Sequence, residues 1–200
     1  MDIIIENAIN FLIAFCVPQW RNYFNKEFAF IKHNSIVEEH TTSHYLDGKM
    51  YFNPNDLILD MGSVIVHEYG HFIFDKMFNE NEKHIITMSF KEETLSFIED
   101  EKYLVKLHQN YCPSLNLNRF CWDRKFCPVM LTDGIGIIKG KSSGLCHRYD
   151  YPIKHLATEL FAEVLEAEVL GYKIPLAIYK GECPQTYSYI KNKIYEVLKP

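Results

Sequence analysis

Two histidines and a glutamate stand together at residues 67–71, which read His-Glu-Tyr-Gly-His and directly follow an apolar run at 64–66. Residues four apart lie one above the other on one face of an α-helix, so both imidazoles can reach one metal ion. Imidazole nitrogens are common zinc ligands, and a glutamate between them can take a proton from a water at the metal. The segment therefore predicts a Zn²⁺ site with His67 and His71 as ligands and Glu68 as general base.

The alternative is a buried helix whose histidines bond to backbone or carboxylate groups. Whether the chain supplies a third ligand decides between the two interpretations. Hydrolytic zinc sites use three protein ligands and leave a fourth position to water. A third histidine close by, as in HExxHxxGxxH, is excluded, because residues 72–77 contain neither the glycine nor the histidine of that pattern. The remaining common solution is a glutamate on a later helix.

Residues 155–164 supply such a helix. Glu159 and Glu163 are four apart, and several of their neighbours are apolar. Two carboxylates on a core-facing helix are costly to bury without a cation, and zinc would supply one. We therefore expect Glu159 as the third ligand and Glu163 as a residue that orients a ligating histidine. The alternative is a solvated glutamate stripe, continued by Glu166 and Glu168.

Together these segments resemble the catalytic domain of anthrax lethal factor and its relatives, which include Pro-Pro endopeptidases and prophage-encoded, toxin-like metallopeptidase domains. The family pattern is HE[FLY]GH, a later tyrosine, ExFAE and a closing amphipathic helix. This chain has HEYGH at 67–71, ELFAE at 159–163 and a segment from Pro184 that fits the closing helix. The resemblance covers roughly residues 50–200.

The resemblance implies an α+β, zincin-like fold and the same site by position. His67, His71 and Glu159 would bind zinc, Glu68 would be the general base, and Glu163 would lie behind the ligands. Family members also use a tyrosine upstream of the ligand glutamate to stabilise the oxyanion.

Tyr151 is the residue that the resemblance implies for this oxyanion role. It stands four residues after His147, as in the prophage-like pattern, with Tyr149 as the second choice. Pro152 occupies the position that the spacing of lethal factor itself would give to the tyrosine.

The predicted activity is zinc-dependent hydrolysis of a peptide bond in a protein or peptide substrate. The resemblance suggests that the protein acts as a toxin or effector. Zinc lowers the pKa of its water, Glu68 removes the proton, and Tyr151 with Zn²⁺ stabilises the oxyanion. Glu68 then passes the proton to the leaving amine. Two alternatives stay open: a regulatory metallopeptidase that cleaves a repressor, and an inactive module that binds metal for folding or interaction.

The remaining histidines have simpler interpretations. His40 and His44 share the four-residue spacing, but the Thr-Thr-Ser between them has little helix tendency, so we expect surface residues. His155 lies one turn before Glu159 and is expected on the helix surface, with a place at the site as the alternative.

Length and composition favour one globular domain over residues 1–200, with 1–40 as an N-terminal extension: 48% of the residues are hydrophobic and 14% aromatic. The net charge of −5, without a Lys/Arg cluster, argues against a nucleic-acid partner. The apolar stretch 8–17 is too short for a membrane span, and no basic signal-peptide region precedes it. We therefore expect a cytoplasmic location in the producing cell, with delivery as a secreted effector as an alternative.

The six cysteines are dispersed and form no CxxC, which favours free, small buried residues in a reducing compartment. The alternative is a second, structural metal at Cys112, Cys121 and Cys127, with Cys146 and His147 further on.

The elements that must position the zinc site follow from periodicity and turn signals. We expect helices at 3–17, 62–78, 153–170 and from Pro184, and one from a capping box at Ser89 through 107. Residues 18–40 read as mixed and 111–152 as mostly irregular. Residues 44–54 read as strands around an Asp47-Gly48 turn, with 50–53 as the edge of the cleft against which a substrate peptide pairs. This order favours an α+β domain with a short mixed sheet.

Overall fold

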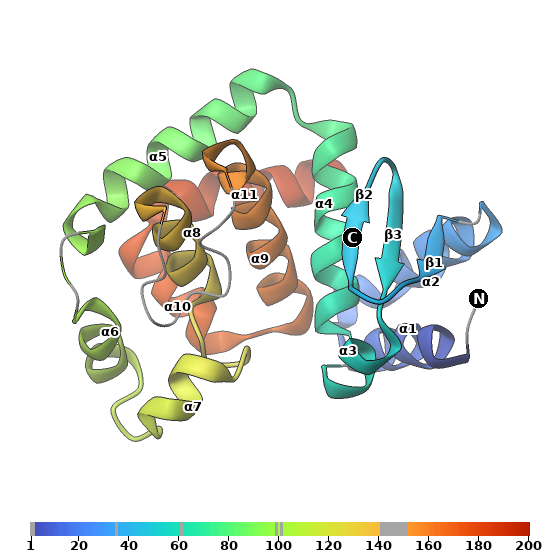
Figure 1. Cartoon of the computed structure of the whole chain (residues 1–200), viewed down its shortest axis with the longest axis horizontal. Coiled ribbons are helices and arrows are strands. Elements are labelled where there is room, and N and C mark those ends of the chain that lie inside the picture. The colour runs from blue at the N-terminus through green and yellow to red at the C-terminus, as the bar shows by residue number, and fades with distance from the viewer. Residues whose placement is uncertain (1–2, 35, 61, 99, 101, 141–151) are drawn as a thin grey trace.

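Helices make up most of the chain, with one small sheet near the N-terminal end, as the predicted α+β class requires (Figure 1). The computed structural model describes residues 3–34, 36–60, 62–98, 100, 102–140 and 152–200. The helices are α1 Ile3–Phe15, α2 Pro18–His33, α3 Pro54–Leu59, α4 Ser63–Met77, α5 Glu80–Ile98, α6 Tyr103–Tyr111, α7 Leu117–Trp122, α8 Val129–Lys139, α9 Leu156–Leu170, α10 Lys173–Glu182 and α11 Pro184–Leu198, with a 3₁₀ turn at Ile153–His155.

The sheet has three strands in the order β1-β3-β2, namely β1 Val37–Glu39, β3 Lys49–Phe52 and β2 His44–Leu46. The hairpin between β2 and β3 is confirmed: Asp47 and Gly48 form its two-residue turn with φ of 48° and 83°. Positive φ at both turn positions is the geometry that matches the twist of the paired strands.

The prediction that residues 50–53 form the edge strand of the cleft is wrong. Strand β1, which the sequence reading did not predict, pairs in parallel with β3, so β3 is central and β2 is the edge. The turn closes at the Leu46–Lys49 pair, and hydrogen-bonded and non-hydrogen-bonded pairs alternate from there. Tyr45 therefore faces Met50 in a non-hydrogen-bonded pair, and the Met50 N–H donates to Ile36 instead. The peptide groups of Tyr45 consequently point away from β3, toward the open edge.

Helix α4 carries the HExxH motif and matches its predicted bounds, with Gly62 before it at φ 97° and Phe78 after it. It stands between the sheet and the N-terminal helices on one side and the C-terminal helices on the other (Figure 1). Its central residues are buried on all sides, as this position demands. Gly70 faces α9 so closely that a Cβ atom there would lie 2.8 Å from the Ala162 Cα. The absence of a side chain at Gly70 thus lets the backbone of α9 approach α4 closely.

Residues 18–40 are not a mixed stretch, because most of them form helix α2. Pro18 ends α1 and occupies the first turn of α2, where its missing N–H is tolerated. Helices α1 and α2 belong to the same hydrophobic core as the C-terminal helices, a core that extends from Ile5 to Leu198. The Val17 N–H donates to the Val169 carbonyl at 2.9 Å, which ties the junction of α1 and α2 to the end of α9.

The helix predicted to start at Ser89 starts nine residues earlier and ends at Ile98, short of residue 107. Asn79 caps it: its side chain accepts from the Glu82 N–H, and Glu82 accepts from the Asn79 N–H, each at 3.0 Å. This reciprocal pair is the capping arrangement that the sequence reading assigned to Ser89. Because Ser89 lies inside a helix with continuous backbone bonding, its capping-box pattern is incidental.

More than half of the described residues in 111–152 are helical, so the prediction of a mostly irregular stretch is wrong for this part, in which α7 and α8 both lie. One glycine of this span, Gly134, packs closely against another helix. A Cβ atom on Gly134 would lie 2.5 Å from the ring of Phe90 on α5. The predicted helices 153–170 and 184 onward are confirmed, the former as a 3₁₀ turn followed by α9, with Gly171 ending α9 at φ 67°.

Five of the six cysteines lie in the described residues, and these five are free and buried, as predicted: Cys16, Cys112, Cys121, Cys127 and Cys183. Cys146 and His147 lie outside the described residues. Within the part of the chain that the structure describes, no cysteine joins a cluster of possible metal ligands. There, too, no helix combines the length and apolar character needed to cross a bilayer.

Candidate metal centre

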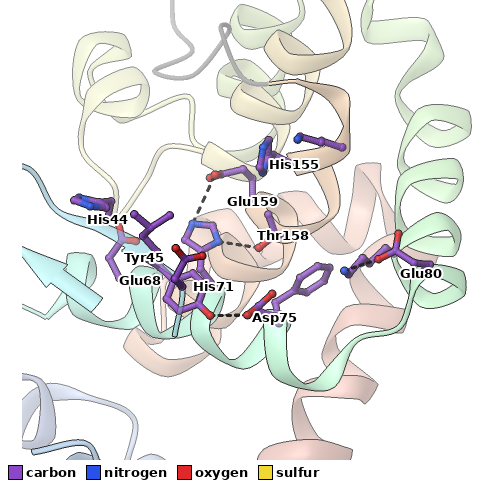
Figure 2. Close-up of a pocket in the computed structure, with 14 residues that line it drawn as sticks. His44, Tyr45, Glu68, His71, Asp75, Glu80, His155, Thr158 and Glu159 are labelled. Carbon is purple, nitrogen blue, oxygen red and sulfur yellow. Dashed lines mark hydrogen bonds and ion pairs between the residues drawn. The ribbon is translucent and has the colours of Figure 1, made fainter. Parts of the chain in front are cut away.

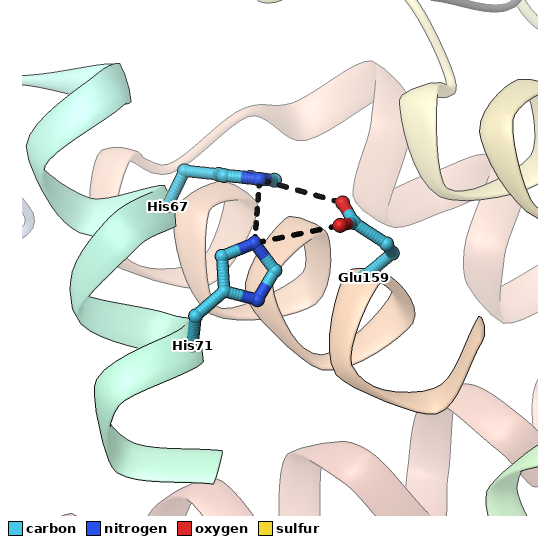
Figure 3. A group of neighbouring side chains, drawn as sticks. All are labelled: His67, His71 and Glu159. Carbon is cyan, nitrogen blue, oxygen red and sulfur yellow. Dashed lines mark hydrogen bonds and ion pairs between the residues drawn. The ribbon is translucent and has the colours of Figure 1, made fainter. Parts of the chain in front are cut away.

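The three predicted ligands meet at one point between α4 and α9 (Figure 3). The Nε2 atoms of His67 and His71 lie 3.1 Å apart. Glu159 presents one oxygen to each: Oε2 is 3.5 Å from His67 Nε2, and Oε1 is 3.6 Å from His71 Nε2. All three residues are buried, with 3%, 8% and 3% of their surfaces exposed. Residues 88 positions apart in sequence are therefore brought into one small triangle of donor atoms.

The spacing of this triangle suits a tetrahedral metal ion. Zinc–nitrogen and zinc–oxygen bonds of about 2.0–2.1 Å separate neighbouring ligand atoms by about 3.3–3.4 Å. The Nε2–Nε2 distance of 3.1 Å and the distances of 3.5 and 3.6 Å from each Nε2 to its nearer Glu159 oxygen lie around that value. The group could thus hold a metal ion without rearrangement of the two helices.

The other ring nitrogens explain why the two Nε2 atoms are available as ligands. His67 Nδ1 lies 3.2 Å from Glu163 Oε1, and His71 Nδ1 lies 2.9 Å from the Thr158 hydroxyl. These neighbours favour protons on both Nδ1 atoms, because the Glu163 carboxylate can only accept and the Thr158 hydroxyl can accept. Both Nε2 atoms then point at the same place, where a cation would be stabilised. Glu163 contacts His67, one of the two predicted ligands.

A second carboxylate lies behind His67. Glu166 Oε2 is 3.7 Å from His67 Nδ1, and Arg124 binds both glutamates from the opposite side. Burial by itself lowers the pKa of His67, but Glu163, Glu159 and Glu166 together raise it well above its usual value. Burial also disfavours the charged form of Glu166 and so acts to raise its pKa. Arg124, His67 and Ser63 outweigh this effect and bring the pKa of Glu166 below its ordinary range. The centre is thus strongly anionic around its histidines.

A cleft of roughly 480 Å³ opens onto this centre (Figure 2). Glu68, His71 and Glu159 line its floor, so the ligand triangle is reached from the cleft side. The opposite wall is the hairpin, including all of β2. Tyr45 holds this wall to α4, because its hydroxyl donates to Asp75 Oδ2 at 2.6 Å. The edge strand of the sheet therefore borders the cleft.

Glu68, the predicted base, is buried at the edge of the cleft. It follows His67 on α4, is 3% exposed and lines the cleft beside His71. His155 also lines the cleft, close to Glu159 (Figure 2), so the alternative of a place at the site fits it better than the helix surface. His40 is exposed as expected, whereas His44 is half-buried in the cleft wall. The proposed oxyanion residue Tyr151 and its substitute Tyr149 lie outside the described residues.

Three partners of the ligands were missed in the sequence: Glu166, Arg124 and Thr158. The interpretation of Glu166 and Glu168 as a solvated stripe is wrong, because both are buried and paired. Glu168 accepts from the hydroxyl of Tyr187 and from Lys191 Nζ at 3.1 Å. Every residue between the glutamates of 159–168 is apolar, and so are the two residues that follow Glu168. This pattern is the signal that could have indicated burial on every face of the helix.

Comparison with protein-family models, with curated proteins and with solved structures found no match to this chain.

Proposed function

We propose that the chain is a zinc-dependent endopeptidase of the type in which a glutamate completes an HExxH site, as the resemblance to lethal factor-like metallopeptidases implies. The observation that carries the proposal is the buried triangle of His67, His71 and Glu159, open to a cleft that Glu68 lines. A site built only for structure is usually closed by four protein ligands. Three ligands beside a cleft and a carboxylate instead suit a catalytic centre.

Zinc is the metal that this donor set favours. Two imidazoles and one carboxylate form a known catalytic zinc set, and no thiolate that would suit softer metals joins it among the described residues. Bound there, zinc would supply a Lewis acid and lower the pKa of a water. Glu68, which lines the cleft together with His71, would take the proton of that water and pass it to the leaving amine. Tyr151 remains our proposed hydrogen-bond donor to the oxyanion, as in the family that the chain resembles.

An extended peptide is the substrate form that the cleft favours. The peptide groups of Tyr45 point toward the open edge of the sheet, and β2 borders the cleft. A substrate backbone can add to such an edge as a further strand, which gives affinity independent of its side chains. The scissile bond would then lie beside Glu68 and the metal. This corrected edge, β2 rather than residues 50–53, is part of the proposal.

The two alternatives differ in what they require of the site. A repressor-cleaving regulator would use the same chemistry on another protein, so identifying the substrate separates it from a toxin or effector. An inactive metal-binding module has no use for a base beside the cleft, and the buried Glu68 therefore favours catalysis.

The test is a peptide-library digest of the zinc-loaded protein, read by mass spectrometry, beside a chelated sample. The proposal expects cleavage at a defined set of peptide bonds that stops on chelation and returns with zinc. Failure of the wild type to bind zinc, or cleavage that persists after complete chelation, would overturn it.

A further inference from the structure

Arg124 reaches the carboxylates behind His67 from the turn between α7 and α8. Its Nη2 atom is 3.0 Å from Glu163 Oε1 and 2.8 Å from Glu166 Oε2, and its Nε atom is 3.0 Å from Glu166 Oε1. Ser63, the first residue of α4, donates to the same Glu166 oxygen at 2.5 Å. The guanidinium thus binds Glu166 with two nitrogens and bridges to Glu163 with one of them.

This arrangement solves a problem of buried charge. Glu163 and Glu166 are 5% and 2% exposed, and both approach the single Nδ1 atom of His67. Their nearest oxygens lie 3.2 and 3.7 Å from that atom. Two buried carboxylates so close to one atom repel each other strongly unless a cation lies between them. One imidazole N–H can donate fully to only one of them. Arg124 supplies the missing charge and donors, so both carboxylates can stay ionised beside His67.

The planar guanidinium is suited to this bridge in a way that an ammonium is not. Its parallel N–H groups match the two oxygens of one carboxylate while a further N–H reaches the second. His67, Glu163 and Glu166 by themselves also have the spacing of a metal-binding group. Because Arg124 already binds both of these carboxylates, their charge is balanced without a metal ion. The group of His67, His71 and Glu159 is therefore the candidate metal site.

We propose that Arg124 is a positioning residue for the metal centre, which acts through Glu163 and Glu166 to fix the orientation and donor strength of His67. The inference rests on the zinc site of the proposed function and adds to it a residue in a different element, remote from the cleft. Partners that hydrogen-bond to a ligating histidine fix its ring and tune its basicity, and their loss weakens metal binding.

The experiment compares three variants of the full chain by zinc affinity, measured by competition with a chromophoric chelator. Arg124→Met removes the charge and the fork, and Arg124→Lys keeps the charge alone. Lys191→Met is the matched control. Lys191 pairs with Glu168, a buried glutamate on the helix that also carries Glu163 and Glu166, and its side chain is 35% exposed against 30% for Arg124. We expect about 10–100-fold weaker zinc binding for Arg124→Met, partial recovery for Arg124→Lys, and a change of less than about twofold for the control.

A cobalt spectrum separates positioning from general stability. In the Co²⁺-substituted protein the visible d–d bands report the ligand field, so Arg124→Met should shift them, whereas Lys191→Met should lower only the unfolding temperature. Should Arg124→Met not fold, Arg124→Lys carries the test, with weaker zinc binding and shifted bands expected.

Two results would contradict the proposal in distinguishable ways. A wild type that binds zinc, beside Arg124 variants of unchanged affinity and spectrum, would overturn this inference alone. A wild type that binds no zinc would overturn the proposed function and this inference with it.

Discussion

Gly70 on α4 and Ala162 on α9 face each other where the two helices meet, so closely that a Cβ atom on Gly70 would stand 2.8 Å from the Ala162 Cα and 3.0 Å from its Cβ. Gly70 immediately precedes His71, and Ala162 lies three residues after Glu159. The close approach of these small residues is therefore what brings the ligands of one helix within reach of the ligand on the other.

Gly70→Ala should consequently destabilise the protein, although alanine is the better helix former. Overpacking costs about 1–3 kcal/mol and the gain in helix propensity is about 1 kcal/mol, so we expect a net loss of up to about 2 kcal/mol. Urea unfolding of the metal-free protein measures this loss, and zinc binding should weaken as well, because α4 is displaced from α9. A variant more stable than the wild type would show that the two helices can separate freely.

Replacing the two site glutamates should separate a ligand from its support. Glu159→Gln removes a charged ligand, and we expect at least about a hundredfold weaker zinc binding. Glu163→Gln retains all three ligands and should weaken binding by about 10–100-fold. Calorimetric titration with zinc ranks the two variants. Equal losses, or a larger loss for Glu163→Gln, would mean that the ligand assignment is wrong.

Removal of the metal should lower the stability of the wild type. The centre holds three buried carboxylates, those of Glu159, Glu163 and Glu166, and Arg124 pairs with the last two, so a divalent ion offsets buried negative charge. Zinc at a hundred times its dissociation constant should add about 2.7 kcal/mol to the free energy of unfolding, visible as a higher melting temperature.

Glu159→Gln is the control for this effect. Its melting temperature should respond little to zinc, and its metal-free form should be at least as stable as the metal-free wild type, because one buried charge is gone. A metal-free wild type that melts at the same temperature as the zinc-loaded protein would contradict the account.

The strand-edge proposal predicts an asymmetry between two substitutions of Tyr45. Tyr45→Pro removes the N–H that points away from β3, and an edge strand tolerates proline there. Tyr45→Phe keeps that N–H and removes only the hydroxyl that binds Asp75. We expect KM for a cleaved peptide to rise about tenfold or more with proline and about threefold or less with phenylalanine, at equal zinc content. The reverse order would place the substrate elsewhere in the cleft.

The sequence predicted those parts of the site that depend on local spacing. The HExxH helix, the Asp47-Gly48 hairpin and the helix of Glu159 and Glu163 each follow from residues within one element, and each is confirmed. The sequence also predicted that His67, His71 and Glu159 come together, because a carboxylate buried on an apolar helix needs a cation nearby.

The parts that could not be predicted depend on tertiary neighbours. Arg124 pairs with Glu166 across 42 residues, and nothing in its own turn indicates a buried partner. Gly134 suggests a loop in the sequence but packs beneath the Phe90 ring inside a helix. Ser89 has the pattern of a cap, yet Asn79 begins that helix. Local propensity in each case gives way to packing that the sequence does not display.

The central claim, hydrolysis at a metal site with Glu68 as the base, is tested most directly by the cleavage rate of one library-derived peptide with zinc-matched wild type, Glu68→Gln and Glu80→Gln. Glu80 is another glutamate that lines the cleft, and it pairs with Lys83. We predict that Glu68→Gln binds zinc but loses about 10²–10⁴-fold in kcat, and that Glu80→Gln cleaves at nearly the wild-type rate. A zinc-loaded Glu68→Gln variant that cleaves as fast as the wild type would contradict the account.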